Sequence, residues 1–348
     1  MGKVAVITPT RNRSGTIDRP GFLEQCIYSV SAQDHGDYVH LIVDDGSEDM
    51  TPEMVDFYRS RDPRILYMRR EKPEGERRTA SFANNAGLRA VFDPGSADFD
   101  GAEMLEDVDY VTVHHSDDLL APGSLSKRSE ALDEGAGMVH GDMYIFFQCN
   151  GKGRIVRCSH ASHKPPGKLY DDILCMKDEI NNHTVMVTRD VAENAGFFDE
   201  SISYGEDLDM SLRCMNACSE TGLPLKAIPE PLAFYRVHGD SITAWANEED
   251  FAMKESDSVL VKNGAIPFLV RLARVRHIIR HPHKHLPHSV KNRLRPLQYM
   301  LFPPEPESAE YMDMVCRHFS RFWDECGEIP EEFTDEDYFT ALARENMP

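Results

Sequence analysis

The stretch Val108-Asp109-Tyr110-Val111-Thr112-Val113-His114-His115-Ser116-Asp117-Asp118-Leu119-Leu120-Ala121-Pro122 decides the fold of this chain. Its apolar, β-branched first half predicts a buried strand, and its second half ends in adjacent carboxylates and a Pro typical of a helix start. Carboxylate oxygens suit Mg²⁺ or Mn²⁺, and two like charges so close need a counter-charge. The stretch therefore predicts a cation site at the C-terminal end of a strand. The alternative is a solvated Ser-Asp-Asp turn that caps the next helix.

The segments before this stretch alternate between strand and helix patterns. Strands are predicted at 3–8, 39–43 and 65–68, and helices at 21–32, 51–59 and 79–91. This order predicts right-handed crossovers and a mixed, mostly parallel α/β sheet with helices on both faces. Ligands bind outside the carboxyl ends of strands in such sheets. We therefore expect three polar tips to converge: Thr8–Arg11, Asp44–Asp45 and Ser116–Asp118.

The second half of the chain continues the pattern with a hairpin, a loop region and a further helix. The hairpin is predicted across 138–157 around Asn150-Gly151, and the region 160–178 is expected to form a loop with a short helix that covers the site as a lid. A helix is predicted to begin near Glu206, where acids in the first turn favour the helix dipole.

Composition and charge narrow the class of protein. The chain has 348 residues and a formal net charge of -21, which argues against binding nucleic acid over its whole surface. It contains no apparent signal peptide or transmembrane segment, so we expect a cytoplasmic protein with reduced cysteines. The series Cys158-x-His160-x₂-His163 suggests zinc, but its spacing matches no standard finger, and we favour free thiols there.

Several ordered motifs together give the first 243 or so residues a resemblance to family 2 glycosyltransferases with the GT-A fold. Each is weak alone, but their order and spacing are typical of that family. The motifs are Thr8-Pro9-Thr10-Arg11-Asn12, Val43-Asp44-Asp45-Gly46-Ser47, Ala83-Asn84-Asn85-Ala86-Gly87-Leu88, Ser116-Asp117-Asp118, Gly196-Phe197-Phe198-Asp199, Glu206-Asp207 with Arg213, and Tyr235-Arg236-x-His238-x₂-Ser241.

The resemblance implies a nucleotide-sugar donor, with a UDP-sugar expected, and Mn²⁺ or Mg²⁺ as cofactor. It implies metal ligation by Asp118, with Asp117 beside it, and a metal or phosphate contact by His238. The resemblance implies these further donor-binding residues: Thr8, Pro9 and Arg11 at the base, Asp44 and Asp45 near the nucleotide, Asn85, and Arg78 and Arg236 at the diphosphate.

The same resemblance implies an inverting displacement in which Asp207 deprotonates the acceptor hydroxyl, with Glu206 as its neighbour or a second acceptor contact. Alternatively, both acids simply cap a helix. Two departures from the family pattern stand out. His115 occupies the position where the family often has an acid, and Asn84 replaces a common Arg.

The expected function is thus that of a metal-dependent inverting glycosyltransferase. Two alternatives are a catalytically inactive GT-A-like module that binds nucleotide sugars, and a nucleotidyltransferase. The second would need a glycine-rich first loop for a triphosphate, and Thr8–Arg13 contains no glycine.

Beyond about residue 244 the resemblance ends. We predict a catalytic domain at 1–243 and a mainly helical region at 244–348 that contains a basic segment at 262–295. That segment combines cations and histidines with an apolar helical stripe, so it could bind an anionic membrane surface, a polyanionic acceptor or nucleic acid. Alternatively, it packs on the acidic catalytic domain or on another copy of the chain as a homo-oligomer.

Overall fold

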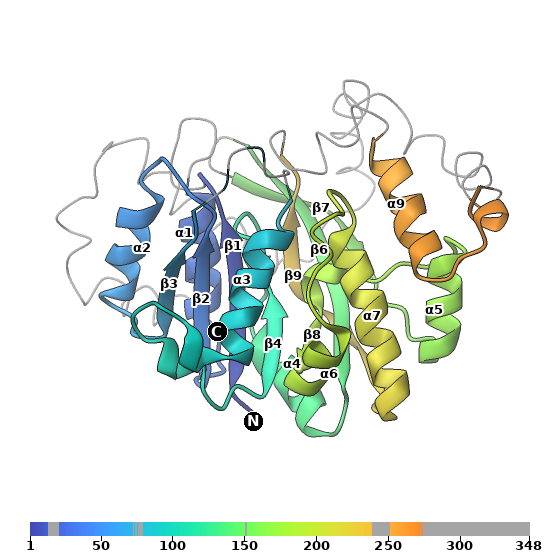
Figure 1. Ribbon diagram of the computed structural model, residues 1–348, viewed down its shortest axis with the longest axis horizontal. Helices are drawn as coiled ribbons and strands as arrows, with labels where there is room; N and C mark the ends of the chain where they lie inside the picture. The colour runs from blue at the N-terminus through green and yellow to red at the C-terminus, as the bar shows by residue number, and fades with distance from the viewer. Residues whose placement is uncertain are drawn as a thin grey trace.

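The structure is a computed structural model that describes residues 1–12, 21–71, 73, 75, 79–149, 152–238, 251–271 and 273. The strands of this part form a single mixed sheet in the order β3-β2-β1-β4-β8-β6-β9-β5, with β7 paired to β6 (Figure 1). The strands are β1 (Val4–Thr10), β2 (Tyr38–Asp44), β3 (Ile65–Arg69), β4 (Tyr110–Val113), β5 (Leu119–Leu120), β6 (Met138–Cys149), β7 (Lys152–Ser159), β8 (Met186–Thr188) and β9 (Leu225–Arg236).

Helices connect the strands and cover both faces of the sheet (Figure 1). The α-helices are α1 (Phe22–Ser31), α2 (Thr51–Arg59), α3 (Ser81–Phe92), α4 (Ser124–Asp133), α5 (Pro166–Leu174), α6 (Arg189–Ala195), α7 (Glu206–Thr221) and α9 (Phe251–Lys262). Short 3-10 turns are η1 (Pro94–Ser96), η2 (Ala102–Leu105) and η3 (Asn182–Thr184).

The first four sheet neighbours, β3, β2, β1 and β4, pair in parallel. Their alternating side chains feed two cores. Ala5 and Ile7 of β1 face α3 and α7, while Val4 and Val6 face the opposite side, where α1 and α4 pack. A strand buried on both faces reads as a continuous apolar run, which is why the sequence shows no polar alternation here.

The second half of the sheet is mixed. Strand β8 pairs antiparallel with both β4 and β6, and β6 pairs in parallel with β9. The predicted fold class, a mostly parallel sheet with helices on both faces, is confirmed. The predicted hairpin is also present as the antiparallel pair β6 and β7.

One local prediction, the helix start at Pro122, needs correction. Leu119 and Leu120 form the short strand β5 against β9, so the helix after Asp118 begins only at Ser124. The acidic stretch between α3 and β4 forms η1 and η2, and the fully buried Leu105 side chain anchors it in the main core.

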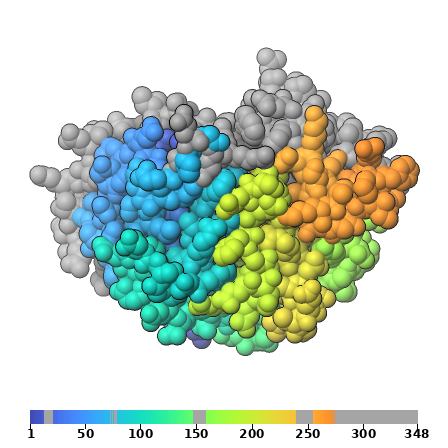
Figure 2. All heavy atoms as spheres, viewed as in Figure 1, coloured from blue at the N-terminus to red at the C-terminus, as the bar shows by residue number. Residues whose placement is uncertain are grey.

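The described part of the predicted C-terminal region begins with α9, which packs against α7 (Figure 2). Among the side chains of α9 that the structure describes, Val259 and Leu260 are buried. Among the residues described, no helix combines the length and apolarity needed to cross a membrane. Arg78 and most of the predicted basic segment 262–295 lie outside the described residues.

Candidate functional site

The ends of β1, β2 and β4 bring the predicted polar tips to one edge of the sheet. Strand β1 lies between β2 and β4, with Thr10 in register with Asp44 and Ile7 in register with Val113. The tips of β1 and β2 are also bonded to each other, because the amide of Asp45 donates to the carbonyl of Thr10 at 2.9 Å. Parallel strands therefore deliver these groups together, as the topology predicts.

Asp44 and Asp45 are both buried and both bonded within the protein. The Asp44 carboxylate accepts from the Tyr67 hydroxyl at 2.6 Å and lies 3.3 Å from the guanidinium of Arg69. Asp45 pairs with Arg70 at 2.5 Å. Arg69 and Arg70, here called the basic rim, therefore lie beside the two acids at the same edge of the sheet. Their guanidinium groups suit an anionic ligand.

The other residues predicted to bind the donor are distributed unevenly. Thr8 is fully buried and bonded to His40 Nε2 at 2.8 Å, Pro9 is buried, and Arg11 is exposed at the tip. Asn85 is 1 % exposed, and its side-chain amide binds the loop after α6. Its Nδ2 donates to the backbone carbonyl of Phe198 at 2.9 Å, and its Oδ1 accepts from the backbone amide of Phe198 at 2.8 Å. Asn85 therefore positions that loop.

Asp117 and Asp118 are held by the end of β9. The backbone amide of Arg236 donates to Asp118 Oδ1 at 2.7 Å, and its side chain donates to the carbonyl of Asp117 at 2.6 Å. His238 Nε2 lies 2.8 Å from Asp117 Oδ2. Arg236 is 1 % exposed and also donates to Gln25 at 2.7 Å. Arg236, which the family resemblance assigns to the diphosphate, therefore holds the Asp117–Asp118 turn in this structure.

A group of possible metal ligands surrounds Asp118. Ligand atoms of His115, Asp118 and His183 all lie within 4.8 Å of one another. Asp118 Oδ2 is 2.8 Å from His183 Nδ1, yet this buried oxygen has no partner in hydrogen-bond geometry. A divalent cation fits this set, since carboxylate and imidazole are both common ligands of Mn²⁺-like ions. His238, predicted as a ligand, contacts Asp117 and is not part of this group.

Two of these three residues were not predicted as ligands. His115 occupies the position where the family pattern has an acid, so the departure supplies an imidazole in its place. His183 comes from η3, in the polar run Asn181-Asn182-His183-Thr184 that precedes β8. In the sequence, only this polar run before a strand pointed to His183. Its position near Asp118 depends on the antiparallel pairing of β8 with β4, which local sequence patterns do not predict.

The two histidines differ in charge. Burial would lower the pKa of His183, but the Asp118 carboxylate outweighs it and raises the pKa to about 9. Burial, followed by the neighbouring His183 ring, lowers the pKa of His115. In the absence of a cation, a protonated His183 therefore balances the charge of Asp118.

The predicted acids Glu206 and Asp207 begin helix α7 and lie next to this group. Asp207, His115 and His183 line one cavity of about 60 Å³. Neither Asp45 nor Asp118 is among the residues that line this cavity.

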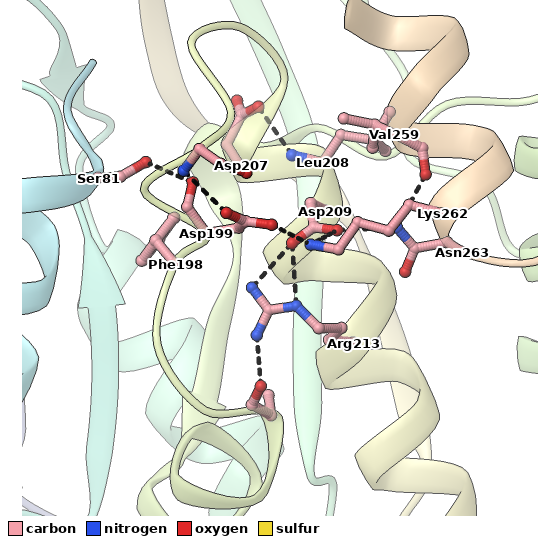
Figure 3. A network of polar contacts seen from close by, with 12 residues as sticks. Ser81, Phe198, Asp199, Asp207, Leu208, Asp209, Arg213, Val259, Lys262 and Asn263 are labelled. Atoms are coloured by element: carbon pink, nitrogen blue, oxygen red, sulfur yellow. Dashed lines mark hydrogen bonds and ion pairs between the residues drawn. The ribbon is translucent and has the colours of Figure 1, made fainter. Parts of the chain in front are cut away.

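The two acids have different environments. Asp207 is half-buried, and its Oδ1 accepts from the amide of Leu208 at 2.7 Å (Figure 3). Glu206 is only 7 % exposed, and burial followed by the charge of Asp207 raises its pKa well above the usual range. Glu206 therefore favours its protonated form.

A network of ion pairs secures the first turns of α7 (Figure 3). The fully buried Asp209 pairs with Arg213 at 2.9 Å on one side and with Lys262 of α9 at 2.9 Å on the other. Lys262 also lies 2.8 Å from Asp199 in the loop that Asn85 holds. Helix α9, outside the predicted catalytic domain, therefore braces the helix that carries Asp207.

The comparisons with known proteins agree with this geometry. A model of glycosyl transferase family 2 matches residues 5–193, more than half of the chain. The fold and the matched residues define a glycosyltransferase. The chain belongs to glycosyl transferase family 2.

Several solved structures align with this chain at low identity. TarS 1–349 of S. aureus, solved in complex with UDP-GlcNAc, is 16% identical with a TM-score of 0.52, and the match covers 93% of this chain and 92% of that one. Against a longer TarS structure the match covers 92% of this chain and 55% of that one, at 15% identity and a TM-score of 0.48. The mannosyltransferase PcManGT of Pyrobaculum calidifontis, in complex with GDP-Man and Mn²⁺, is 15% identical with a TM-score of 0.48, covering 93% and 88% of the two chains. No curated protein matched the sequence.

Proposed function

We propose that this chain transfers a sugar from a UDP-sugar to an acceptor hydroxyl with inversion at the anomeric carbon, and that it needs a divalent cation. The observation that carries this proposal is the position of Asp207, which shares a cavity lining with His115 and His183. His183 in turn contacts Asp118 at 2.8 Å. A carboxylate base beside a ligand group is the arrangement that such a displacement requires.

The base is assigned to Asp207 instead of Glu206 because Asp207 is half-buried, whereas Glu206 is buried and has a raised pKa. A general base must be deprotonated before it can accept a proton, and the raised pKa of the buried Glu206 disfavours that form. In the proposed step the Asp207 carboxylate takes the proton of the acceptor hydroxyl while the hydroxyl oxygen bonds to the anomeric carbon. The bond from that carbon to the phosphate oxygen breaks, and UDP leaves.

The cation is assigned to His115, Asp118 and His183. When bound, it would neutralise the negative charge that develops on the leaving diphosphate. Asp117 and His238 hold each other at 2.8 Å beside this group, and Arg236 fixes the turn from below. The proposed donor site also includes Thr8, Pro9, Arg11, Asp44 and Asp45 at the strand ends.

The choice of a UDP-sugar as donor has two supports. The strand-end acids with their basic rim suit a nucleotide and its phosphates, and the TarS structure of the same fold holds UDP-GlcNAc. For the acceptor, the sequence predicts a polyanionic molecule or a site at an anionic membrane surface, bound through the basic segment 262–295.

Release of nucleotide from a panel of UDP-, GDP- and TDP-sugars with Mn²⁺, with and without EDTA, tests the proposal. Asp207→Asn should lower the rate of transfer by about 10²- to 10⁴-fold while leaving binding of UDP and Mn²⁺ intact. Asp190→Asn is the matched control, because Asp190 is an exposed acid in the first turn of α6.

Two outcomes would overturn this proposal. Full activity in Asp207→Asn would show that the base is elsewhere. Binding of UDP-sugars without any turnover, in every combination of donor and metal, would favour the inactive binding module. Retention of activity in EDTA would remove the metal requirement but not the transferase activity.

A further inference from the structure

A second group of possible metal ligands lies at the root of the hairpin formed by β6 and β7. Cys158 and His160 are two residues apart and therefore share one face of the extended chain. The register pairs Tyr144 with Cys158 and Met143 with Ser159, which places Asp142 opposite His160. The neighbouring strand β6 thus adds the carboxylate of Asp142, 16 residues before Cys158 in the chain, to the Cys158 and His160 pair.

The three side chains converge on one point. His160 Nδ1 is 2.8 Å from Asp142 Oδ2 and 3.9 Å from Cys158 Sγ, and all three ligand atoms lie within 4.8 Å of one another. Ligands about 2.0–2.3 Å from a tetrahedral zinc ion lie roughly 3.3–3.8 Å from each other. Small side-chain rotations therefore suffice to bring these atoms to zinc-binding distances.

The surroundings hold the carboxylate and leave one side open. Asp142 is 9 % exposed in its side chain, and its other oxygen accepts from the amide of Ala161 at 2.7 Å. The His160 side chain is 76 % exposed. A fixed, buried acid beside an accessible imidazole gives an ion a route into the site from solvent.

A further histidine on β6 shows that polar groups are concentrated here. His140 is fully buried, and neither of its ring nitrogens has a hydrogen-bond partner among the described residues. It lies two residues before Asp142 on the same strand.

We propose that Asp142, Cys158 and His160 bind a structural zinc ion. The thiol of Cys158 would lose its proton to solvent on binding, so two anionic ligands and a neutral imidazole would balance the charge of the ion. Thiolate and imidazole select zinc over Mg²⁺ or Ca²⁺, and the group at Asp118 contains no sulfur. The fourth position is left for water or for His163.

The position of this site explains what the ion would stabilise. Asn181 donates to the carbonyls of Gly141 at 2.8 Å and Ser159 at 3.0 Å, directly beside the proposed ligands. Asn181 immediately precedes η3, which carries His183. The ion would therefore fasten β6, β7 and the following chain to the element that supplies a ligand to the candidate active site.

Cobalt substitution in the full chain, stripped of metal by a chelator, tests the proposal. Co²⁺ bound to a thiolate absorbs in the near ultraviolet, whereas Co²⁺ bound by oxygen and nitrogen alone does not. We expect this absorption in the native chain and in Cys175→Ser, which removes another partly buried thiol, and its loss in Cys158→Ser. Asp142→Asn should weaken Zn²⁺ affinity by at least about tenfold.

A second measurement does not depend on the folding of a variant. Zn²⁺ should protect Cys158 of the native chain from alkylation, as read by mass spectrometry, and leave the labelling of Cys175 unchanged. Absence of the thiolate band in the native chain, or equal alkylation of Cys158 with and without Zn²⁺, would overturn the proposal. Loss of the band in His163→Gln as well would add that residue as the fourth ligand.

Discussion

The ion pairs at Asp209 allow a quantitative prediction about the helix that carries Asp207. The Asp209 side chain is fully buried, and its two oxygens are divided between two cations. One oxygen lies 2.9 Å from the Arg213 guanidinium, and the other lies 2.9 Å from both the Lys262 ammonium and the amide nitrogen of Asn263 (Figure 3). Asp209→Asn keeps the shape of the side chain but removes the charge that both cations share.

The size of the effect follows from the burial of each partner. Removal of one member of a buried ion pair costs about 3–5 kcal/mol when the remaining charge stays buried. Here the remaining charges can reach water, because the side chains of Arg213 and Lys262 are 22% and 41% exposed. We therefore expect Asp209→Asn to lower the free energy of unfolding by about 3 kcal/mol, the lower end of that range.

The opposite partner should matter much less. Lys262→Met removes two partly exposed pairs, to Asp209 and Asp199, and leaves Asp209 with Arg213 and Asn263. Exposed pairs contribute about 0.2–1 kcal/mol each, so we expect a loss of about 1 kcal/mol. Asp56→Asn is the surface control, since Asp56 is 65% exposed and pairs with Arg59 at 3.5 Å.

Urea unfolding of the four proteins measures these differences, and the rate of nucleotide release measures their effect on the site. We expect the rate to fall in Asp209→Asn and in Lys262→Met, because both loosen the turn that holds Asp207, and to stay unchanged in Asp56→Asn. Equal stability losses in Asp209→Asn and Asp56→Asn would refute the reasoning. A normal rate in a clearly destabilised Asp209→Asn would show that the network supports the fold but not the base.

Two further predictions concern the core of the sheet. Gly87→Ala should lower the free energy of unfolding by about 1 kcal/mol, because its Cβ would lie 2.5 Å from Ile7 Cγ2, and overpacking by about 1–3 kcal/mol outweighs a gain of up to about 1 kcal/mol in helix propensity. Gly36→Ala, with nothing within 4 Å, is the control, and an unchanged urea midpoint for Gly87→Ala would contradict the prediction. Burial lowers the pKa of His40 in the folded state to about 3 from an ordinary 6.5, so unfolding takes up a proton below about pH 6.5. The free energy of unfolding should therefore decrease as the pH is lowered from about 6.5 to 3, by up to about 1.4 kcal/mol per pH unit from this residue. His40→Gln should make the free energy of unfolding depend less steeply on pH in this range. Parallel pH profiles for the native chain and His40→Gln would contradict this.

Local sequence patterns predicted the first half of the sheet well. The apolar runs at β1, β2 and β4 are each complete within a few residues, and their order along the chain is enough to predict parallel neighbours. Polar residues that directly follow such strands must appear at the same edge. For this reason the sequence predicts Asp44, Asp45, Asp117 and Asp118 at the same edge of the sheet.

The contacts that complete the site depend on pairings between distant segments. His183 reaches Asp118 only because β8 inserts antiparallel between β4 and β6. Arg236 is buried and donates to the carbonyl of Asp117, because β9 runs beside β6 and ends next to the Asp117–Asp118 turn.

The same distinction applies to the second cluster and to the base. The spacing of Cys158 and His160 was visible in the sequence, but Asp142 joined them only through the register of β6 and β7. Glu206 and Asp207 are adjacent acids in the first turn of α7, and only Glu206 is buried. This difference depends on how α7 packs in the fold and cannot be read from the two neighbouring letters in the sequence. Residue type and strand order, both local properties, thus determined which groups meet at the sheet edge. Burial and cross-strand register depend on the whole fold. They decided which of these groups are buried, which lie together as possible ligands and which hold other residues in position.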